Sequence, residues 1–175
     1  CTVDITLVND SPRVNLSVAP FVPHIDEDIR TVDNNGTLVS DLIVDGILED
    51  DDQNTVVGIA VTGVDQTNGL WQFQTSAGAG WQTIFQLLTS VNNAVLLNRD
   101  NDTRIRFTPS QHFHGNATFT FVAWDTTDGL DEGTVVDAES TGERDAFSTT
   151  EQTVMFVVDP VNDAPASFAS PTVVV

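Results

Sequence analysis

The feature that most restricts the fold of this chain is a series of short runs rich in Val, Ile, Thr, Phe and Trp, separated by Gly, Asp, Asn and Pro. Such runs are typical of β-strands. In the run 117–124, Phe119, Phe121 and Ala123 fall on one face and the residues between them on the other, as in a half-buried strand. No long stretch repeats its apolar residues with a helical period. We therefore predict an all-β fold, a sandwich of two antiparallel sheets, with strands at residues 2–8, 55–64, 70–75, 104–109, 117–124 and 153–158.

The segments between these runs predict two short turns and one long loop. Residues 65–69 and 75–80 have turn composition, and the second turn would place Trp81 opposite the preceding strand in a hairpin. Residues 126–150 lose the hydrophobic pattern, which predicts a long loop whose far end Phe147 holds against the core. Residues 90–97 fit either a short helical turn or a further strand.

Length and charge limit the classes of function. The 175 residues suffice for one domain with a core and are too few for two ordinary ones. There are 26 acidic residues against 6 basic ones, all Arg, and the net charge is −20. Because binding to nucleic acid needs clustered basic side chains, nucleic acid is excluded as a partner. No apolar stretch approaches the roughly 18–20 residues of a membrane helix, and the start lacks a signal-peptide pattern, so we expect no membrane span in this segment.

The chain contains one cysteine, Cys1, so no disulfide can form within this segment. Its position fits a cut point, an engineered residue, or a bridge to something outside the segment.

Nearly the same five-residue phrase occurs near both ends of the chain, VNDSP at 8–12 and VNDAP at 161–165. The two aspartates, Asp10 and Asp163, are 153 positions apart, and the residues before and after the phrase also match at nearly this spacing. Such a pattern is typical of a tandem array with a period of about 150 residues; chance similarity between two β-rich ends is the alternative. We predict that residues 1–12 are the last strand and linker of one repeat, 13–165 one repeat, and 166–175 the start of the next.

Several runs, taken in order, carry a family resemblance: HIDED with GTLVSDLI within 24–43, then 49–75, 104–129, 145–148 and the phrase VNDAP. Together they resemble the cadherin-like tandem repeats of very large surface proteins. The resemblance implies an Ig/cadherin-type β-sandwich that occurs in strings outside the cell and serves in spacing, adhesion or surface coating. It does not imply catalysis.

The resemblance also raises a question about calcium, because cadherin repeats hold Ca²⁺ with acidic residues at the joint between modules. Ca²⁺ takes six to eight oxygen ligands, which loops from two modules can supply together. The matching positions in this chain are Glu27, Asp50, Asp52, Asp125, Asp159, Asn162 and Asp163. The chain departs from the family pattern in its linker, where the central oxygen donors are shifted, and at Thr6, where the N-terminal copy should carry Asp. The alternative is that these acids cap turns and face water.

Covalent glycans are a second expectation. Acceptor triplets for N-linked sugar begin at Asn15, Asn35, Asn101 and Asn116, with a poorer one at Asn9 that Pro12 follows. They carry sugar only if the host is eukaryotic.

Enzyme activity is not expected, because no phosphate loop, nucleophile elbow or CxxC motif occurs. His112 and His114 have the spacing of a partial metal site on one side of a strand, but His24, the third histidine, is distant in sequence. Paired carboxylates within 49–52 or 125–145 leave a secreted hydrolase as the third hypothesis.

Trp71, Trp81 and Trp124 are expected in the core, although an exposed Trp in the 70–81 hairpin would favour carbohydrate binding.

We therefore place two hypotheses about function ahead of the hydrolase. The first is a glycosylated structural repeat of an extracellular filament or giant cell-surface protein, with adjacent repeats as its partners, head to tail. The second is an adhesin module that binds a glycan or protein ligand through 126–150, with calcium-stiffened joints.

Overall fold

The computed structural model describes residues 8–52, 58–90, 92–139 and 144–164. Strands make up 41% of the described residues and helix 3%, which confirms the predicted all-β class. None of the described helical segments is long and apolar enough to cross a membrane. The strand predicted at 2–8 lies almost wholly outside the described residues, and so does the start of the run 55–64.

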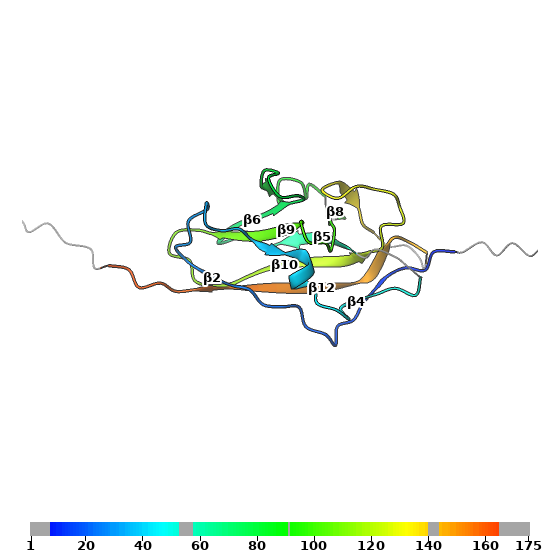
Figure 1. Ribbon diagram of the computed structural model, residues 1–175, viewed down its shortest axis with the longest axis horizontal. Helices are drawn as coiled ribbons and strands as arrows, with labels where there is room; N and C mark the ends of the chain where they lie inside the picture. The colour runs from blue at the N-terminus through cyan, green and yellow to red at the C-terminus, as the bar shows by residue number, and fades with distance from the viewer. Residues whose placement is uncertain (1–7, 53–57, 91, 140–143, 165–175) are drawn as a thin grey trace, which may run out of the picture.

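Three sheets make up the described fold (Figure 1). One has six strands in the order β11-β8-β5-β10-β12-β2, another has four in the order β3-β9-β6-β7, and β1 pairs with β4. The strands are β1 (Arg13–Val14), β2 (His24–Asp26), β3 (Thr37–Leu38), β4 (Leu48–Glu49), β5 (Gly58–Val64), β6 (Gly69–Gln74), β7 (Gln82–Thr83), β8 (Asn93–Leu97), β9 (Arg104–Pro109), β10 (Gly115–Trp124), β11 (Val135–Asp137) and β12 (Phe147–Asp159), and α1 is Val39–Leu42.

The core lies between the six-stranded and the four-stranded sheets and is centred on Trp71 of β6. This side chain is 1% exposed, and its ring centroid lies 5.1 Å from that of Phe107, 5.2 Å from Phe119 and 4.9 Å from Phe156. Its indole Nε1 donates a hydrogen bond to the carbonyl of Asp65 at 2.9 Å. Because these rings come from strands of both sheets, their packing joins the two layers.

The predicted alternation along β10 holds over its first part and fails at its end. Ala117, Phe119 and Phe121 are buried while the threonines between them are partly exposed, but Val122 and Trp124 are buried as well. They belong to a second apolar cluster on the other face of the sheet, which includes Phe147. Both faces of the sheet are therefore covered at the end of β10, so the side chains on both faces are apolar there.

The cover over this second cluster comes from the segment predicted as a long loop, and the structure corrects that prediction. Within residues 126–150, β11 pairs with β8, and β12 already begins at Phe147. Phe147 is 8% exposed, as expected of an anchor. The ambiguous run 90–97 contains strand β8, and the hairpin predicted after Trp71 is present, although Gln82, not Trp81, begins its second strand.

The six-stranded sheet is not wholly antiparallel, contrary to the prediction. Its edge strand β2 runs parallel to β12, with His24 opposite Val157 and Asp26 opposite Asp159. The antiparallel β10–β12 pair lies beside it and is the longest ladder of the fold. β12 runs along the long axis of the molecule, and the described chain starts at one end of this axis and finishes at the other (Figure 1).

Candidate functional site

The seven residues predicted to bind calcium fall into two groups at opposite ends of the protein. Asp50, Asp52 and Asp125 lie beside the N-terminal copy of the repeated phrase. Asp125 accepts a hydrogen bond from Asn9, Asp52 accepts one from Asp10, and Asp50 is a neighbour of both acids. The other four are at the C-terminal copy: Glu27 and Asp159 lie beside it, and Asn162 and Asp163 belong to it. Each copy of the phrase therefore contacts a different end of the same module.

We define the N-terminal pole as Asn9, Asp10, Asp50, Asp52 and Asp125. The Asn9 amide donates to Asp125 Oδ2 at 2.9 Å, and the Asp10 backbone N–H donates to Asp52 Oδ2 at 2.9 Å. Asp125 follows β10 and is fully buried, although it is a carboxylate. Its other oxygen accepts hydrogen bonds from the backbone and hydroxyl of Thr127, at 2.8 and 2.6 Å, so its burial is compensated.

Asp50 is the least satisfied acid of this pole. Its Oδ1 accepts a hydrogen bond from the Asp52 backbone at 2.8 Å, but its buried Oδ2 has no partner among the described residues. Burial raises the pKa of the Asp50 carboxyl, and the neighbouring carboxylates of Asp125, Asp52 and Asp51 raise it further, against the hydrogen bond from Asp52. An unpaired buried oxygen among carboxylates is the arrangement that a bound cation would relieve.

We define the C-terminal pole as Glu27, Asp159, Val161, Asn162 and Asp163. Glu27 follows β2 and is 8% exposed; its Oε1 accepts a hydrogen bond from the Val161 backbone at 2.8 Å. The Glu27 backbone in turn donates to the carbonyl of Asp159 at 3.0 Å. Because both bonds join residues 132 or more positions apart, the parallel pairing of β2 with β12 is what brings this acid to the linker.

All three histidines of the chain lie at the C-terminal pole, each beside a carboxylate. His24 Nδ1 is 2.9 Å from Asp159, His112 Nδ1 is 3.3 Å from Asp163, and His114 Nδ1 is 3.4 Å from Glu27. The prediction that two of these imidazoles share one side of a strand is wrong. Both belong to the turn between β9 and β10, because β9 ends at Pro109 and β10 begins only at Gly115.

The acids of a single module meet only part of the ligand requirement of Ca²⁺. Among the described residues, three potential ligand atoms within 4.8 Å of one another are found at Asp28, His112 and Asp163, and the N-terminal pole supplies no such set. The acids of each pole are oxygen donors of the type that Ca²⁺ takes, but one pole alone offers too few converging oxygens. Calcium binding therefore stays a prediction, and it needs both poles.

The predicted glycosylation sites are largely accessible. Asn35, Asn101 and Asn116 are exposed. Asn15 is half-buried, and its amide donates to Glu49 Oε1 at 2.9 Å. The hydroxyl of Thr103, which completes the acceptor triplet of Asn101, is buried against Glu132 at 2.7 Å.

The prediction for the tryptophans holds for two of the three. Trp71 and Trp124 are 1% exposed, but Trp81 is only half-buried. The buried guanidinium of Arg106 lies 4.0 Å from the centroid of the Trp81 ring, and this cation–π contact holds the ring in place. Trp81 lines an open groove of about 550 Å³ together with Asn35, Gln74, Ala77, Gly78 and Arg104.

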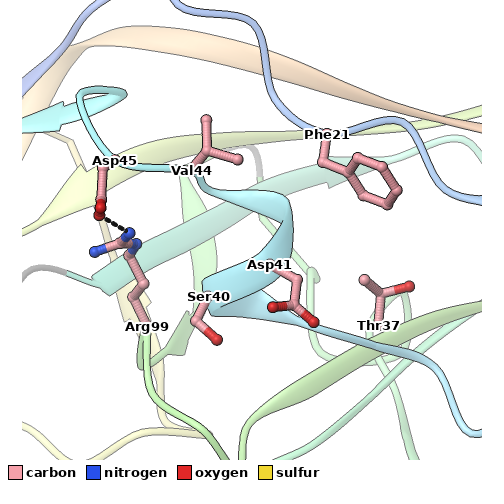
Figure 2. Close-up of a pocket in the computed structure, with 7 residues that line it drawn as sticks. All are labelled: Phe21, Thr37, Ser40, Asp41, Val44, Asp45 and Arg99. Carbon is pink, nitrogen blue, oxygen red and sulfur yellow. Dashed lines mark hydrogen bonds and ion pairs between the residues drawn. The ribbon is translucent and has the colours of Figure 1, made fainter.

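A second open groove lies beside α1 and has a volume of about 500 Å³ (Figure 2). Arg99 and Asp45 pair on one side of it at 2.5 Å, and the ring of Phe21 stands on the other side, 53% exposed. Its polar groups do not converge, so we assign it no chemistry.

Comparison with known proteins finds no matching family model, no curated protein and no solved structure. The arrangement of the two poles is therefore what bears on function. Sequence reasoning missed Asp28 as a potential ligand and left His112 without partners. The available signal was local, an Asp directly after Glu27 in the HIDED run, but nothing in the sequence places it beside His112.

Proposed function

We propose that this chain is a structural repeat of an extracellular filament or giant cell-surface protein, with an Ig/cadherin-type β-sandwich fold, and that adjacent repeats join head to tail. The observation that carries the proposal is the placement of the two copies of one phrase at opposite ends of an elongated module. A module of this form extends an array without turning back on itself.

The contacts of the two copies are complementary, which supports a defined joint. The C-terminal copy is bound to its module by the backbone of its first residue, since Val161 N–H donates to Glu27, and by the side chain of its third, since Asp163 lies 3.3 Å from His112. The N-terminal copy is bound through its second and third residues, since Asn9 and Asp10 bond to Asp125 and Asp52. In an array a single copy would make both sets of contacts. The Val161 N–H and the Asp163 side chain would bind the preceding repeat, and the Asn162 amide and the Asp163 N–H would bind the following one.

Calcium would suit such a joint. The joint would combine Glu27 and Asp159 of one repeat, the phrase itself, and Asp50, Asp52 and Asp125 of the next, which include the unpaired Asp50 oxygen. That set offers enough carboxylate and carbonyl oxygens for the six to eight ligands of Ca²⁺. A bound ion would also reduce the repulsion that the acids impose on one another. Sugars on the exposed Asn35, Asn101 and Asn116 would coat the resulting rod.

A second candidate is an adhesin module, and the half-buried Trp81 favours it. A ring fixed by Arg106 beside the amide and guanidinium groups of Gln74 and Arg104 is suited to stacking on a sugar. This candidate places the ligand at the 75–81 turn, not at 126–150, where it was expected from the sequence.

The proposal is tested with a two-module protein in which Asp163 of the first module is followed directly by Ser11 of the second, so that the phrase occurs once at the joint. Small-angle scattering should give a rigid rod of about twice the length of one module, with chelator making it more flexible and Ca²⁺ restoring it. Substitution Asn162→Ala should loosen the joint, because its amide would bond to Asp125 of the next module.

The matched control is Asn9→Ala in the first module, which removes the same contact where no module precedes it. Its scattering should equal that of the parent protein. Modules that move independently in every form would refute head-to-tail docking, whereas a rod unaffected by chelator would refute only the calcium component.

A further inference from the structure

We propose that Asp28, His112 and Asp163 form a binding site for Zn²⁺ at the C-terminal pole. Their potential ligand atoms all lie within 4.8 Å of one another, and all three side chains are exposed to solvent. They come from the turn after β2, the turn between β9 and β10, and the segment after β12. The site lies within one module, so its test does not depend on assembly into an array.

The distances are close to those of a zinc site. Zn²⁺ binds imidazole nitrogen at about 2.0–2.1 Å and carboxylate oxygen at about 2.0–2.2 Å in tetrahedral geometry, so neighbouring ligand atoms lie roughly 3.3 Å apart. His112 Nδ1 and Asp163 Oδ2 already have this separation, at 3.3 Å. Rotation of exposed side chains suffices to bring the Asp28 carboxylate inward, and water would fill the fourth position.

The backbone that carries His112 is held from three directions. The Ser110 N–H donates to the carbonyl of Asn68 at 2.8 Å, and the Phe113 N–H donates to the carbonyl of Ser110 at 3.1 Å. The Phe113 ring packs edge-on against Phe107, with the ring centroids 6.2 Å apart. His112 itself has a φ of +60°, in the left-handed region, where His, Asn and Asp are the more tolerated residues. Packing of the partly buried Phe113 against the core thus leaves the His112 ring at the surface.

The backbone segments that carry the two aspartates are held beside this turn through Glu27, which neighbours Asp28. The buried Glu27 carboxylate accepts the Val161 backbone N–H at 2.8 Å and lies 3.4 Å from His114. It therefore connects the turn after β2, the β9–β10 turn and the linker that carries Asp163. Ligand positions that the protein holds before the metal arrives lose less entropy when it binds.

The ligand types distinguish this site from the predicted calcium joint. Ca²⁺ and Mg²⁺ take oxygen ligands, whereas imidazole together with carboxylate suits Zn²⁺ and its neighbours in the first transition series. Asp163 belongs to both ligand sets, but His112 does not fit an oxygen-only site. A zinc ion here would tie the linker to the body of the module and so fix the direction in which the chain leaves it.

The test measures metal binding by the 175-residue chain with Cys1→Ser, which removes the only thiol. Isothermal titration with Zn²⁺ should give one ion per chain, and Co²⁺ should give the visible absorption of a tetrahedral site. His112→Asn, which retains a residue tolerated at positive φ, and Asp28→Asn should each weaken binding at least about tenfold.

The matched control is His24→Asn, which removes an exposed imidazole from the same pole, one that pairs with Asp159 and lies outside the set. It should leave the affinity unchanged. The chain has three histidines, so the imidazole NMR signals can be followed singly, and that of His112 should respond to Zn²⁺ at the lowest concentrations. No saturable binding, an equal loss in the His24 variant, or displacement of Co²⁺ by excess Ca²⁺ would each overturn the proposal.

Discussion

Replacing Asp50 with Asn should stabilise the metal-free protein at neutral pH. The Asp50 Oδ2 is buried without a partner, and Asp125 and Asp52 are charged neighbours. A buried polar group left unpaired costs about 1–3 kcal/mol, and an Asn amide can also donate a hydrogen bond to one of the adjacent carboxylates. We therefore expect the free energy of unfolding to rise by about 1–2 kcal/mol, which corresponds to roughly 2–8 °C in Tm for a chain of this size.

The effect should depend on pH in a defined direction. Because the folded-state pKa of Asp50 is raised, the neutral form of this side chain favours the folded state. That contribution is fully present below the ordinary pKa of Asp and is lost as the pH rises through the folded-state pKa. The advantage of Asp50→Asn over the natural protein should therefore be largest at neutral pH and should shrink in acid.

Urea unfolding, followed by the fluorescence of the buried Trp71 and Trp124 in the presence of chelator, measures both quantities. The matched control is Asp51→Asn, one position along the chain, because Asp51 is exposed and pairs with Arg13. An exposed pair of this kind contributes little, so the control should change stability by less than about 0.5 kcal/mol. Equal effects of the two substitutions, or a loss of stability in Asp50→Asn, would refute the argument from burial and repulsion.

Two further predictions concern the C-terminal pole and the core. Glu27→Ala should increase the rate of hydrogen exchange at the Val161 amide, measured by NMR, while leaving the Asp10 amide at the opposite pole unchanged; equal protection of Val161 in both proteins would contradict the proposed role of Glu27. Trp71→Phe should lower the free energy of unfolding by about 2 kcal/mol or more in urea denaturation, because it opens a cavity and leaves the Asp65 carbonyl without its donor; a change within the error of the measurement would contradict this account.

The local pattern of the chain predicted much of the strand content because the alternation of side chains along a strand is a local property. The run 104–109 coincides with β9, and the run 117–124 lies within β10. The pattern failed at Val122 and Trp124, where a segment 12 to 25 residues further along the chain covers the second face of the sheet. The loop at 126–150 was misjudged for the same reason, since β11 is three residues long and is held by its pairing with β8.

For the candidate sites, too, the sequence identified the residues but not their arrangement in space. Comparison of the two ends of the chain with each other found the repeated phrase and its acidic neighbours, because repetition and residue type are properties of the sequence alone. It could not assign those acids to two opposite poles. Only the parallel pairing of β2 with β12 brings Glu27 to Val161, and only the β9–β10 turn brings His112 to Asp163. His24, distant in sequence, proved to lie at the same pole as the other two histidines.

The sequence by itself thus determined the all-β class, the position of the five longest described strands and the recurrence of the VND phrase at a spacing of 153 residues. The tertiary structure alone decided which acids share a pole, which of them is left unpaired, and which side chains converge in three dimensions. The physical reason is that strand formation follows from neighbours along the chain. Convergence follows from hydrogen-bonded ladders and core packing between residues that are often more than a hundred positions apart.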